Sequence, residues 1–357
     1  MRLVHTEASL GWGGQEIRIL SESQGLIARG HDVQLLCPSE ARIFSEASRW
    51  RVPVTALPIG RKRPLGVKAL YKWLKRNRCD LVCTHSSTDA WLAAFALLAL
   101  GRPVPMVRMR HISAPVPSNA PTRWLYTRAT ARIVTTGEAL RRELIERNHF
   151  PAARIDSVPT GVDAKRYRPG DRAAARTALK LPQRAMLVGI VATLRDWKGH
   201  EYLIDGLPES AHLVIVGDGP RRQILENYVD SRGVRARTVF AADQADVVPW
   251  LQALDIFVLP SYANEGVPQA LIQAMMTGLP CITTHAGSIA ELARDGDTAL
   301  VVPMKDAAAI RSALERLMRD EPLRRKLGEA ARKHAATNFS LERMLDRMET
   351  IYGQARR

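Results

Sequence analysis

The sequence is poor in cysteine, and it has no hydrophobic run long enough to cross a membrane. Its four cysteines are scattered through 357 residues without a CxxC pair, and each lies in or beside an apolar segment. Buried, reduced thiols of a cytoplasmic protein are therefore expected. The longest apolar run, residues 90–100, is far shorter than the roughly 20 residues of a membrane-spanning helix and predicts a buried helix instead.

The N-terminus lacks the apolar core of a signal peptide. Its first residues, MRLVHTEASLGWGG, reach a glycine-rich loop too early to hold such a core, and they predict a β-strand. The chain also has no short-period repeat and no low-complexity tract. We therefore expect an ordinary globular protein without a membrane-spanning segment.

Acidic residues are scarce in the first half of the chain. Residues 1–160 hold 24 basic and 12 acidic side chains, whereas residues 161–357 hold 28 and 24. Most of the net charge of +16 therefore lies in the first half. Such a basic half indicates an anionic partner: a membrane surface, a phosphorylated substrate or nucleic acid. Because the aromatic motifs on which single-stranded nucleic acids stack are absent, we expect no nucleic-acid partner.

The length predicts two domains, at roughly 100 to 200 residues each. The first half opens with a strand, a glycine loop, a helical pattern over residues 15–29 and a second strand, which together begin a doubly wound parallel sheet. Later strands of this sheet are predicted at DLVCTH, VPMVRMR and RIVTTG. The proline-punctuated residues 157–170 have no period and predict a linker.

A second α/β pattern follows the linker. Six predicted strands, AMLVGIVATL, AHLVIVGDG, RTVFAA, DIFVLPS, PCITTH and TALVVP, alternate with helical segments. We therefore predict two Rossmann-like domains, residues 1–160 and 161–338, that face each other across a cleft. Residues 339–357 are predicted to form a helix that packs back on the first domain.

The glycine loop GWGG resembles a dinucleotide fingerprint only in part. Its glycines at positions 11, 13 and 14 put Glu16 where the fingerprint has its last glycine, and the second strand ends without an acid for a ribose. Three interpretations stay open: a nicotinamide site, a tight turn, or a backbone contact from Gly13 or Gly14 to a phosphate or sugar. The third is the one we adopt, since amides at a helix start favour anions.

Two loops of the second domain carry candidate residues at the carboxyl ends of strands, where ligands bind in open α/β sheets. In ATLRDWKGH, Arg195 and Lys198 are two cations that suit a diphosphate, although a solvated loop is the alternative. In VGDGP, Gly217 is either a ligand contact or part of an ordinary turn.

The stretch ANEGVPQALIQAMMTGLPC places one acid, Glu265, before an apolar helical pattern. Pro268 suits the first turn of that helix and Gly278 its end. The amides of Gly266 and Val267 are candidates for holding a phosphate, and Glu265 for accepting hydrogen bonds from sugar hydroxyls. Gln269 and Gln273, four residues apart, share a helical face.

Taken together, these motifs resemble the retaining nucleotide-sugar glycosyltransferases of family four, which have the two-domain GT-B fold. The resemblance covers nearly the whole chain and rests on GGQE, PTGVDAKRYRP, LRDWKG, VGDGPRR, DIFVLPS and EGVPQALIQAMMTGLPCITTHAGSIAEL. It implies that Glu265 contacts the donor sugar and that the following amides contact the phosphate. It also implies a ribose contact eight residues later, where similar proteins have glutamate and this chain has Gln273.

Two further positions follow from the resemblance. Similar proteins commonly have arginine five residues before the lysine, where this chain has Thr193, so Arg195 is the expected substitute beside Lys198. His111, in VRMRHISAPVPS, falls where similar enzymes have a histidine near the reacting sugar. Asp295 and Asp297 are spaced like a metal-binding pair, but they occupy a turn. We therefore expect no metal and no cofactor other than the nucleotide sugar as co-substrate.

The predicted activity is transfer of a sugar from a nucleotide diphosphate donor, with a UDP-sugar as the expected case, to an acceptor hydroxyl with retention. Resemblance around RHISAPVPSNAPTRWLY points to lipopolysaccharide or other surface glycans, so a glycan or lipid-linked glycan is the expected acceptor. The basic residues 61–78 predict association with an anionic membrane surface, and an ordinary helix with its charged side in water is the alternative. The alternatives are an epimerase or a phosphorylase with the same fold, or a protein that only binds polyanions.

Overall fold

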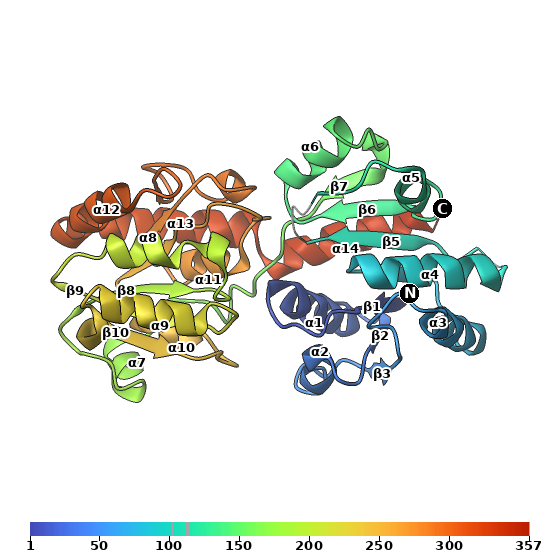
Figure 1. Cartoon of the computed structure of the whole chain (residues 1–357), viewed down its shortest axis with the longest axis horizontal. Coiled ribbons are helices and arrows are strands. Elements are labelled where there is room, and N and C mark those ends of the chain that lie inside the picture. The colour runs from blue at the N-terminus through green and yellow to red at the C-terminus, as the bar shows by residue number, and fades with distance from the viewer. Residues whose placement is uncertain (102, 112–114, 357) are drawn as a thin grey trace. The chain divides into compact units, whose positions relative to one another are not determined.

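The computed structural model describes residues 1–101, 103–111 and 115–356, and the chain divides into two compact units. The first unit comprises Met1–Gly161 with Leu341–Arg357, and the second comprises Val162–Ser340. Each unit is a parallel β-sheet with helices packed against its faces (Figure 1). The predicted α/β class, with two Rossmann-like domains, is confirmed.

The sheet of the first unit has seven parallel strands in the order β3-β2-β1-β4-β5-β6-β7. Its central strands consist largely of apolar residues and are buried on both faces, because helices cover each side of the sheet. The strands are β1 (Arg2–Thr6), β2 (Asp32–Cys37), β3 (Val54–Ala56), β4 (Leu81–Thr84), β5 (Met106–Arg110), β6 (Arg132–Thr135) and β7 (Ile155–Ser157).

Helices connect these strands, and two of the helices begin with a side-chain cap, from Ser86 and from Asn119. Ser86 and Asp89 form a capping box at the start of α4, since the Ser86 amide donates to the Asp89 carboxylate at 2.7 Å and the Asp89 amide donates back to the Ser86 hydroxyl. The helices are α1 (Gly14–Ala28), α2 (Arg42–Glu46), α3 (Pro64–Arg76), α4 (Ser87–Leu100), α5 (Ala120–Thr127) and α6 (Glu138–Glu146), with a 3₁₀ turn η1 (Ala152–Arg154).

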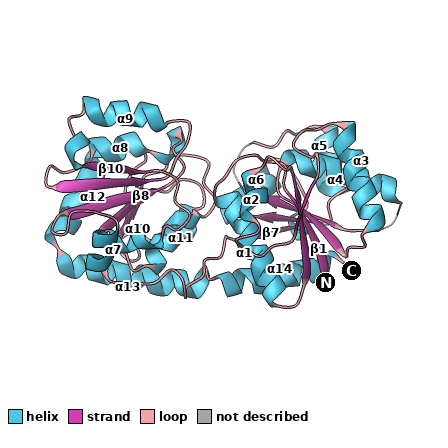
Figure 2. Cartoon of the chain, turned by 90° about the horizontal axis from the view of Figure 1, so that it is seen from below, coloured by secondary structure: helices cyan, strands magenta, loops and turns pink. Residues whose placement is uncertain are grey.

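The sheet of the second unit has six parallel strands in the order β10-β9-β8-β11-β12-β13, drawn in magenta between cyan helices in Figure 2. The strands are β8 (Met186–Val191), β9 (Ala211–Val216), β10 (Thr238–Ala241), β11 (Ile256–Leu259), β12 (Cys281–Thr283) and β13 (Leu300–Val301). The α-helices are α7 (Arg172–Ala178), α8 (His200–Asp205), α9 (Arg222–Ser231), α10 (Val248–Ala253), α11 (Gln269–Met276), α12 (Ala307–Arg319) and α13 (Glu321–Asn338). Short 3₁₀ turns are η2 (Asp196–Lys198), η3 (Arg235–Arg237) and η4 (Ile289–Glu291).

Each sheet reverses its strand order beside its first strand. The reversal falls between β1 and β4 in the first unit and between β8 and β11 in the second. The connections after two such strands leave toward opposite faces of the sheet, which opens a crevice at the carboxyl ends of the strands. A ligand site is therefore expected at the carboxyl ends of these four strands.

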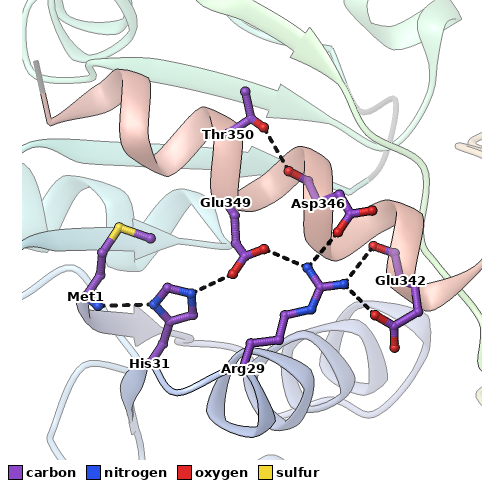
Figure 3. Close-up of polar contacts among 7 residues, drawn as sticks. All are labelled: Met1, Arg29, His31, Glu342, Asp346, Glu349 and Thr350. Carbon is purple, nitrogen blue, oxygen red and sulfur yellow. Dashed lines mark hydrogen bonds and ion pairs between the residues drawn. The ribbon is translucent and has the colours of Figure 1, made fainter.

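The last helix, α14 (Leu341–Ala355), belongs to the first unit although it follows the second in sequence. Figure 3 shows how the end of α1 holds it. The Arg29 guanidinium pairs with Asp346 at 2.8 Å and with Glu349 at 2.6 Å, and it also contacts Glu342. On its other side α14 buries an apolar face in the core: Met344, Leu345, Met348, Ile351 and Tyr352.

The N-terminal amine extends the same network. It lies 3.1 Å from Nδ1 of His31, and Nε2 of His31 lies 2.7 Å from Glu349. Because an ammonium only donates, Nδ1 of His31 accepts and the ring proton is on Nε2, which donates to the carboxylate. The two ends of the first unit are thus joined by charge-assisted hydrogen bonds.

Two expectations about local structure were wrong, and two short strands were missed. The three-residue strands β3 and β7 were not predicted, because each is short and part of β3 is exposed. The apolar run at 90–100 lies in α4 but is not fully buried, since Phe95 is 46% exposed and Leu98 is 69% exposed. Of the four free cysteines, Cys79 is only half-buried.

Among the described residues, no helix combines the length and the apolar character needed to span a bilayer.

Candidate functional site

The strongest polar contact at the predicted site joins Lys198 to Glu265. Lys198 ends the turn after β8, and Glu265 lies in the loop after β11, so the two residues flank the strand-order reversal of the second sheet. The ammonium Nζ donates to Oε1 of the carboxylate at 2.6 Å. Only 6% of the Glu265 side chain and 18% of the Lys198 side chain are exposed, so the pair is largely shielded from water.

Close backbone packing brings the two loops together. The Tyr262 amide donates to the Trp197 carbonyl at 2.9 Å, which ties the loop after β11 to the lysine turn. Gly199 has a left-handed φ of 74°, and a Cβ there would lie 2.2 Å from the carbonyl oxygen of Pro260. Only glycine fits this position, and Lys198 is thereby held against the end of β11.

The loop after β12 supports Glu265 from the other side. The Ser288 amide donates to the Glu265 carbonyl at 3.3 Å, and a Cβ on Gly287 would lie 1.9 Å from that same oxygen. The backbone of Glu265 is therefore fixed by a glycine that the sequence analysis did not assign.

Helix α11 starts directly beyond this acid. Gly266 and Val267 are buried, and Pro268 is the N-cap residue rather than part of the first turn, so the helix begins at Gln269. Gly278 follows the helix with a left-handed φ of 83°, where a helix end commonly has glycine. The positive end of α11 thus lies next to Glu265, an arrangement that favours an anion.

Gln273 is buried in α11, and its amide Nε2 donates to the Tyr167 hydroxyl at 3.0 Å. Tyr167 comes from the segment that the sequence analysis described as a linker. The structure therefore gives Gln273 a protein partner. Its amide oxygen and the Tyr167 hydroxyl proton stay as the groups that a ribose hydroxyl can meet.

Arg195 contacts the lysine turn through its backbone, because the Lys198 amide donates to the Arg195 carbonyl at 3.2 Å. No side-chain hydrogen bond or ion pair among the described residues joins Arg195 or Gly217 to Lys198 or Glu265. The Arg195 side chain is exposed, and its guanidinium lies over the Trp197 ring, 5.2 Å from the ring centroid. The Gly217 amide donates to the Ala241 carbonyl at 3.0 Å, which continues the β9–β10 pairing. Both residues lie just after the carboxyl ends of strands, as predicted from the sequence.

The acids of the ARDGDTA turn have protein partners. Asp295 Oδ1 accepts a hydrogen bond from the Val301 amide at 2.8 Å. Asp297 lies 3.8 Å from Arg294. Both contacts are those of a turn before a short strand.

His200 begins α8 next to Lys198 and is buried, and neither ring nitrogen has a hydrogen-bond partner among the described residues. Burial, with help from the cations of Lys198 and Arg221, lowers the pKa of His200 to about 3. The imidazole is therefore neutral in the folded protein at neutral pH.

This shift predicts that acid destabilises the second unit through His200. Below pH 6.5 the unfolded chain protonates His200, whereas the folded chain protonates it only near pH 3. The free energy of unfolding therefore decreases as the pH falls from 6.5 to about 3. Between pH 7 and pH 5 wild type should lose about 2 kcal/mol more unfolding free energy than His200→Leu. Urea unfolding of both proteins at the two pH values measures the difference, and parallel losses would contradict it.

In the first unit, α1 begins at Gly14 with Gly13 as its N-cap residue. The loop is anchored by Glu7, at the end of β1, which accepts hydrogen bonds from the Ser9 amide at 2.8 Å and from the Gln15 side chain. Burial, followed by repulsion from Asp89, raises the pKa of Glu7 to about 8, so this carboxyl keeps its proton at neutral pH. Glu7 was not predicted as a site residue, although it is an acid at the end of the first predicted strand.

His111 follows β5 and is half-buried. Its ring stacks on that of His85, with Nε2 of His111 3.0 Å from Nδ1 of His85. His85 in turn stacks on His5, with Nε2 of His85 2.9 Å from Nδ1 of His5. We refer to these three residues, from adjacent strands β1, β4 and β5, as the histidine row.

The histidine row ends in a buried polar cluster between the sheet, α1 and α14. Tyr352 donates to Glu22 at 2.5 Å and lies 3.6 Å from the Cys83 sulfur, and Glu22 lies 3.5 Å from Nε of Arg18. Arg18 and Glu22 have no side-chain exposure at all. Their charges are neutralised by each other and by hydrogen bonds rather than by water.

One group of described side chains has the spacing to share a metal ion. The ligand atoms of His5, Cys83 and His85 lie within 4.8 Å of one another, and imidazole and thiol groups suit zinc or copper. In the structure these imidazoles bond to each other, and burial raises the pKa of Cys83, which favours its protonated form. The arrangement is accounted for by hydrogen bonds within the protein.

Two family models match the chain. One, described as "Glycosyl transferases group 1", matches residues 171–334, and the other, described as "Glycosyltransferase Family 4", matches residues 12–166. The chain belongs to the family-four glycosyltransferases. The resemblance to this family found in the motifs is therefore confirmed.

Similar curated proteins include D-inositol 3-phosphate glycosyltransferases. That of Nocardia farcinica is 29% identical over 279 residues, and that of Mycobacterium bovis is 29% identical over 295 residues. These alignments cover 74% and 79% of this glycosyltransferase but only 59% of each relative. The chain therefore matches less than two thirds of their length.

Solved structures show the same fold. A glycosyltransferase from Rickettsia africae matches with a TM-score of 0.89 at 18% identity, over 99% of this chain and 98% of that one. Anabaena HepE in complex with UDP-glucose matches with a TM-score of 0.87 at 18% identity, over 99% and 100%. At these identities the matches establish that the glycosyltransferase has the GT-B fold.

Proposed function

We propose that this glycosyltransferase moves a sugar from a nucleoside diphosphate donor, a UDP-sugar in the simplest case, to an acceptor hydroxyl with retention at the anomeric carbon. The observation that carries the proposal is the buried Lys198–Glu265 pair at the strand-order reversal of the second sheet. UDP and UDP-glucose are bound by Anabaena HepE, which has the same fold. The motifs that surround the pair are those of the family.

Each group of the donor has a chemical counterpart beside this pair. The Lys198 ammonium faces the diphosphate, whose negative charge grows as it leaves, and Arg195 adds a second cation from the same turn. Amides of Gly266 and Val267, at the positive end of α11, hold phosphate oxygens. The Glu265 carboxylate accepts hydrogen bonds from sugar hydroxyls through the oxygen that Lys198 does not occupy.

The first unit supplies the acceptor side in this proposal. His111 contacts the reacting sugar, and the backbone at Gly13 and Gly14 contacts the donor from the start of α1. The acceptor is a glycan or a lipid-linked glycan of the cell surface. The basic character of the first 160 residues supports an acceptor that is anionic or carried on an anionic surface.

A thermal-shift screen tests donor binding. UDP-, GDP- and ADP-sugars are added to the whole chain, with inorganic phosphate as the control for charge alone. A true donor at 100 times its Kd adds about 2.7 kcal/mol of stability, and the free nucleoside diphosphate should give a similar shift. If no nucleotide sugar or nucleoside diphosphate shifts the unfolding temperature, donor binding is refuted.

Product analysis then separates transfer from related reactions. Nuclear magnetic resonance of the product reports the anomeric configuration, which should match that of the donor. Conversion of the donor without an acceptor would indicate an epimerase, and sugar 1-phosphate formed with added phosphate would indicate a phosphorylase. Lys198 and the α11 amides neutralise the diphosphate in this proposal, so sugar transfer should continue in the presence of EDTA. Inhibition by EDTA that Mg²⁺ reverses would refute metal-independent transfer.

Gln273→Glu should keep donor affinity or raise it. The structure makes this exchange tolerable, because Tyr167 can reverse its hydrogen bond and donate its hydroxyl proton to the new carboxylate. A glutamate also accepts ribose hydroxyls more strongly than an amide does. Titration with UDP gives the Kd of wild type and variant, with Gln273→Leu as the control that loses the polar group. A tenfold weaker Kd for the glutamate variant, about 1.4 kcal/mol, would contradict the prediction.

Helix α3 presents a basic face to solvent, as the sequence indicated. Leu70 and Leu74 are buried on one side of the helix. The opposite side exposes four basic residues, Lys68, Lys72, Lys75 and Arg76. Neighbouring α4 adds the exposed side chains of Phe95 and Leu98, so charge and apolar surface lie on adjacent helices.

We therefore expect the protein to associate with anionic bilayers. At roughly 1 kcal/mol for each basic residue near an anionic surface, the four residues supply several kcal/mol, enough for reversible binding. Co-sedimentation with phosphatidylserine and phosphatidylcholine vesicles at low and high salt measures it. Binding should need the anionic lipid, weaken with salt and drop for the triple variant with glutamate at positions 68, 72 and 75. Equal binding to both vesicles, or none at low salt, would favour an acceptor free in solution.

A further inference from the structure

The histidine row gives the candidate catalytic residue His111 a fixed chemical context. His5 pairs with Cys83 across β1 and β4, and Cys83 pairs with Val107 across β4 and β5. His85 lies two residues beyond Cys83 and His111 lies four residues beyond Val107, so all three histidines project from the same face of the sheet. The row thus runs diagonally across three strands toward their carboxyl ends.

Two hydrogen bonds join the three rings, and each bond needs one proton. Burial lowers the pKa of His5, and burial lowers the pKa of His85 and of His111 well below the usual value. Three neutral imidazoles carry three ring protons, so two protons lie within the row and the third lies at one end. Both bonds must point in the same direction, because a neutral ring donates through one nitrogen and accepts through the other.

The direction of these bonds decides which nitrogen of His111 carries a proton. If they point outward from the core, His5 and His85 donate through Nδ1, and the proton of His111 lies on Nδ1. If they point inward, His111 donates through Nε2, and the last proton lies on Nε2 of His5. That nitrogen is buried and has no hydrogen-bond partner in the described part of the chain.

A buried N–H without an acceptor is rarer in proteins than a buried acceptor without a donor. The nearby charges oppose each other, because Glu22 raises the pKa of His5 and Arg18, with a smaller effect, lowers it. The arrangement in which Nε2 of His5 carries no proton is therefore favoured. In that arrangement His5 donates to His85, and His85 donates to His111.

We propose that His85 and His5 are positioning residues that fix His111 in the tautomer with its proton on Nδ1. Nε2 of His111 is engaged in the hydrogen bond with His85, so Nδ1 is the ring nitrogen that can contact a ligand. Because Nδ1 carries the proton, it acts as a hydrogen-bond donor. This inference rests on the proposed function, in which His111 meets the reacting sugar. A donor at this position holds a sugar oxygen and cannot act as a base.

The tautomer is read directly from the ¹⁵N chemical shifts of the whole chain labelled with ¹⁵N-histidine. The His111 signals are assigned by their loss in His111→Asn. In wild type we expect a protonated Nδ1 and an unprotonated Nε2 for both His85 and His111. A His111 with its proton on Nε2, or one that averages between both forms, would overturn the proposal.

Two substitutions at position 85 form a matched test. Asparagine places an amide N–H near the position of Nδ1 and can still donate to His111, whereas leucine cannot. His85→Leu should lower kcat by about tenfold to a hundredfold, as loss of an outer partner of a functional histidine does, with little change in the donor KM. His85→Asn should recover most of that loss and restore the Nδ1 tautomer. Equal kcat in both variants would contradict a positioning role.

His31→Asn is the control, since it removes a histidine of the same unit that contacts Glu349 rather than the row. It should leave the His111 shifts and kcat unchanged. The proposed function and the proposed tautomer can be refuted separately. If wild type transfers no sugar, the proposed function is wrong while the tautomer can still be measured. If transfer is normal but His111 is protonated on Nε2, the function stands and the histidine row does not set the tautomer as proposed.

Discussion

Replacing Lys198 with alanine should lower kcat for sugar transfer by about 10² to 10³, the usual effect of losing one preorganised donor that stabilises developing charge. The ammonium lies at the strand-order reversal of the second sheet, between β8 and β11. It is 2.6 Å from Glu265 and mostly shielded from water. A cation in such a position interacts with a diphosphate more strongly than one in solvent does. Initial-rate kinetics with the identified donor measure the loss.

The same substitution also leaves the Glu265 carboxylate buried without its partner, and this lowers stability. The double variant Lys198→Ala with Glu265→Gln separates the two effects, because it removes the buried charge as well. We expect the double variant to regain stability but not activity. Lys326→Ala, an exposed lysine on α13, is the control for removal of a positive charge elsewhere in the second unit. Activity of Lys198→Ala within threefold of wild type would refute the assignment.

Long apolar strands and their flanking motifs could be predicted from the sequence. Each of the six strands of the second sheet is an apolar segment followed by a polar or glycine-containing loop, so both the strands and the position of Lys198 at a strand end were predictable. The strands β3 and β7 could not be, because they are short edge strands with half-exposed residues, VTA and IDS, whereas the equally short β12 is fully buried. They exist because neighbouring strands offer free hydrogen-bonding edges.

The partners of the site residues are what the sequence could not show. Lys198 and Glu265 are 67 positions apart, and only the adjacency of β8 and β11 brings them together. Gln273 was interpreted as a substitute for a ribose-binding acid, but its contact with Tyr167 depends on the path of the linker. Tertiary register rather than local pattern decides such pairs.

The polar cluster under the histidine row was missed for the same reason. Arg18 and Glu22 are four residues apart in α1, a spacing usual for an exposed ion pair on a helix surface. Their burial becomes apparent only when α14, from the far end of the sequence, covers that face of the helix. A helical pattern alone does not indicate that a later segment will bury its charged side.

This cluster carries the second large prediction. Arg18→Met should destabilise the first unit by about 3 to 5 kcal/mol, because it leaves the fully buried Glu22 carboxyl without its cationic partner. It also removes the donor to the Val158 carbonyl, which Arg18 Nη1 contacts at 2.7 Å. Burial raises the pKa of Tyr352 well above its usual value, so its phenol stays protonated and still donates to Glu22, but one hydrogen bond does not replace a cation.

A double-variant cycle identifies the buried charge as the cause. Glu22→Gln keeps an acceptor for Tyr352 and removes the charge, so adding it to Arg18→Met should recover at least about 2 kcal/mol of the loss. Hydrogen exchange of the most protected amides in α1 and β1 follows the first unit separately from the second. If the two substitutions simply add, the buried charge is not what destabilises Arg18→Met. If the double variant recovers stability, the loss in Arg18→Met comes mainly from the unpaired buried carboxyl of Glu22. The ion pair would then stabilise the packing of α14 against α1 chiefly because each buried charge has a partner.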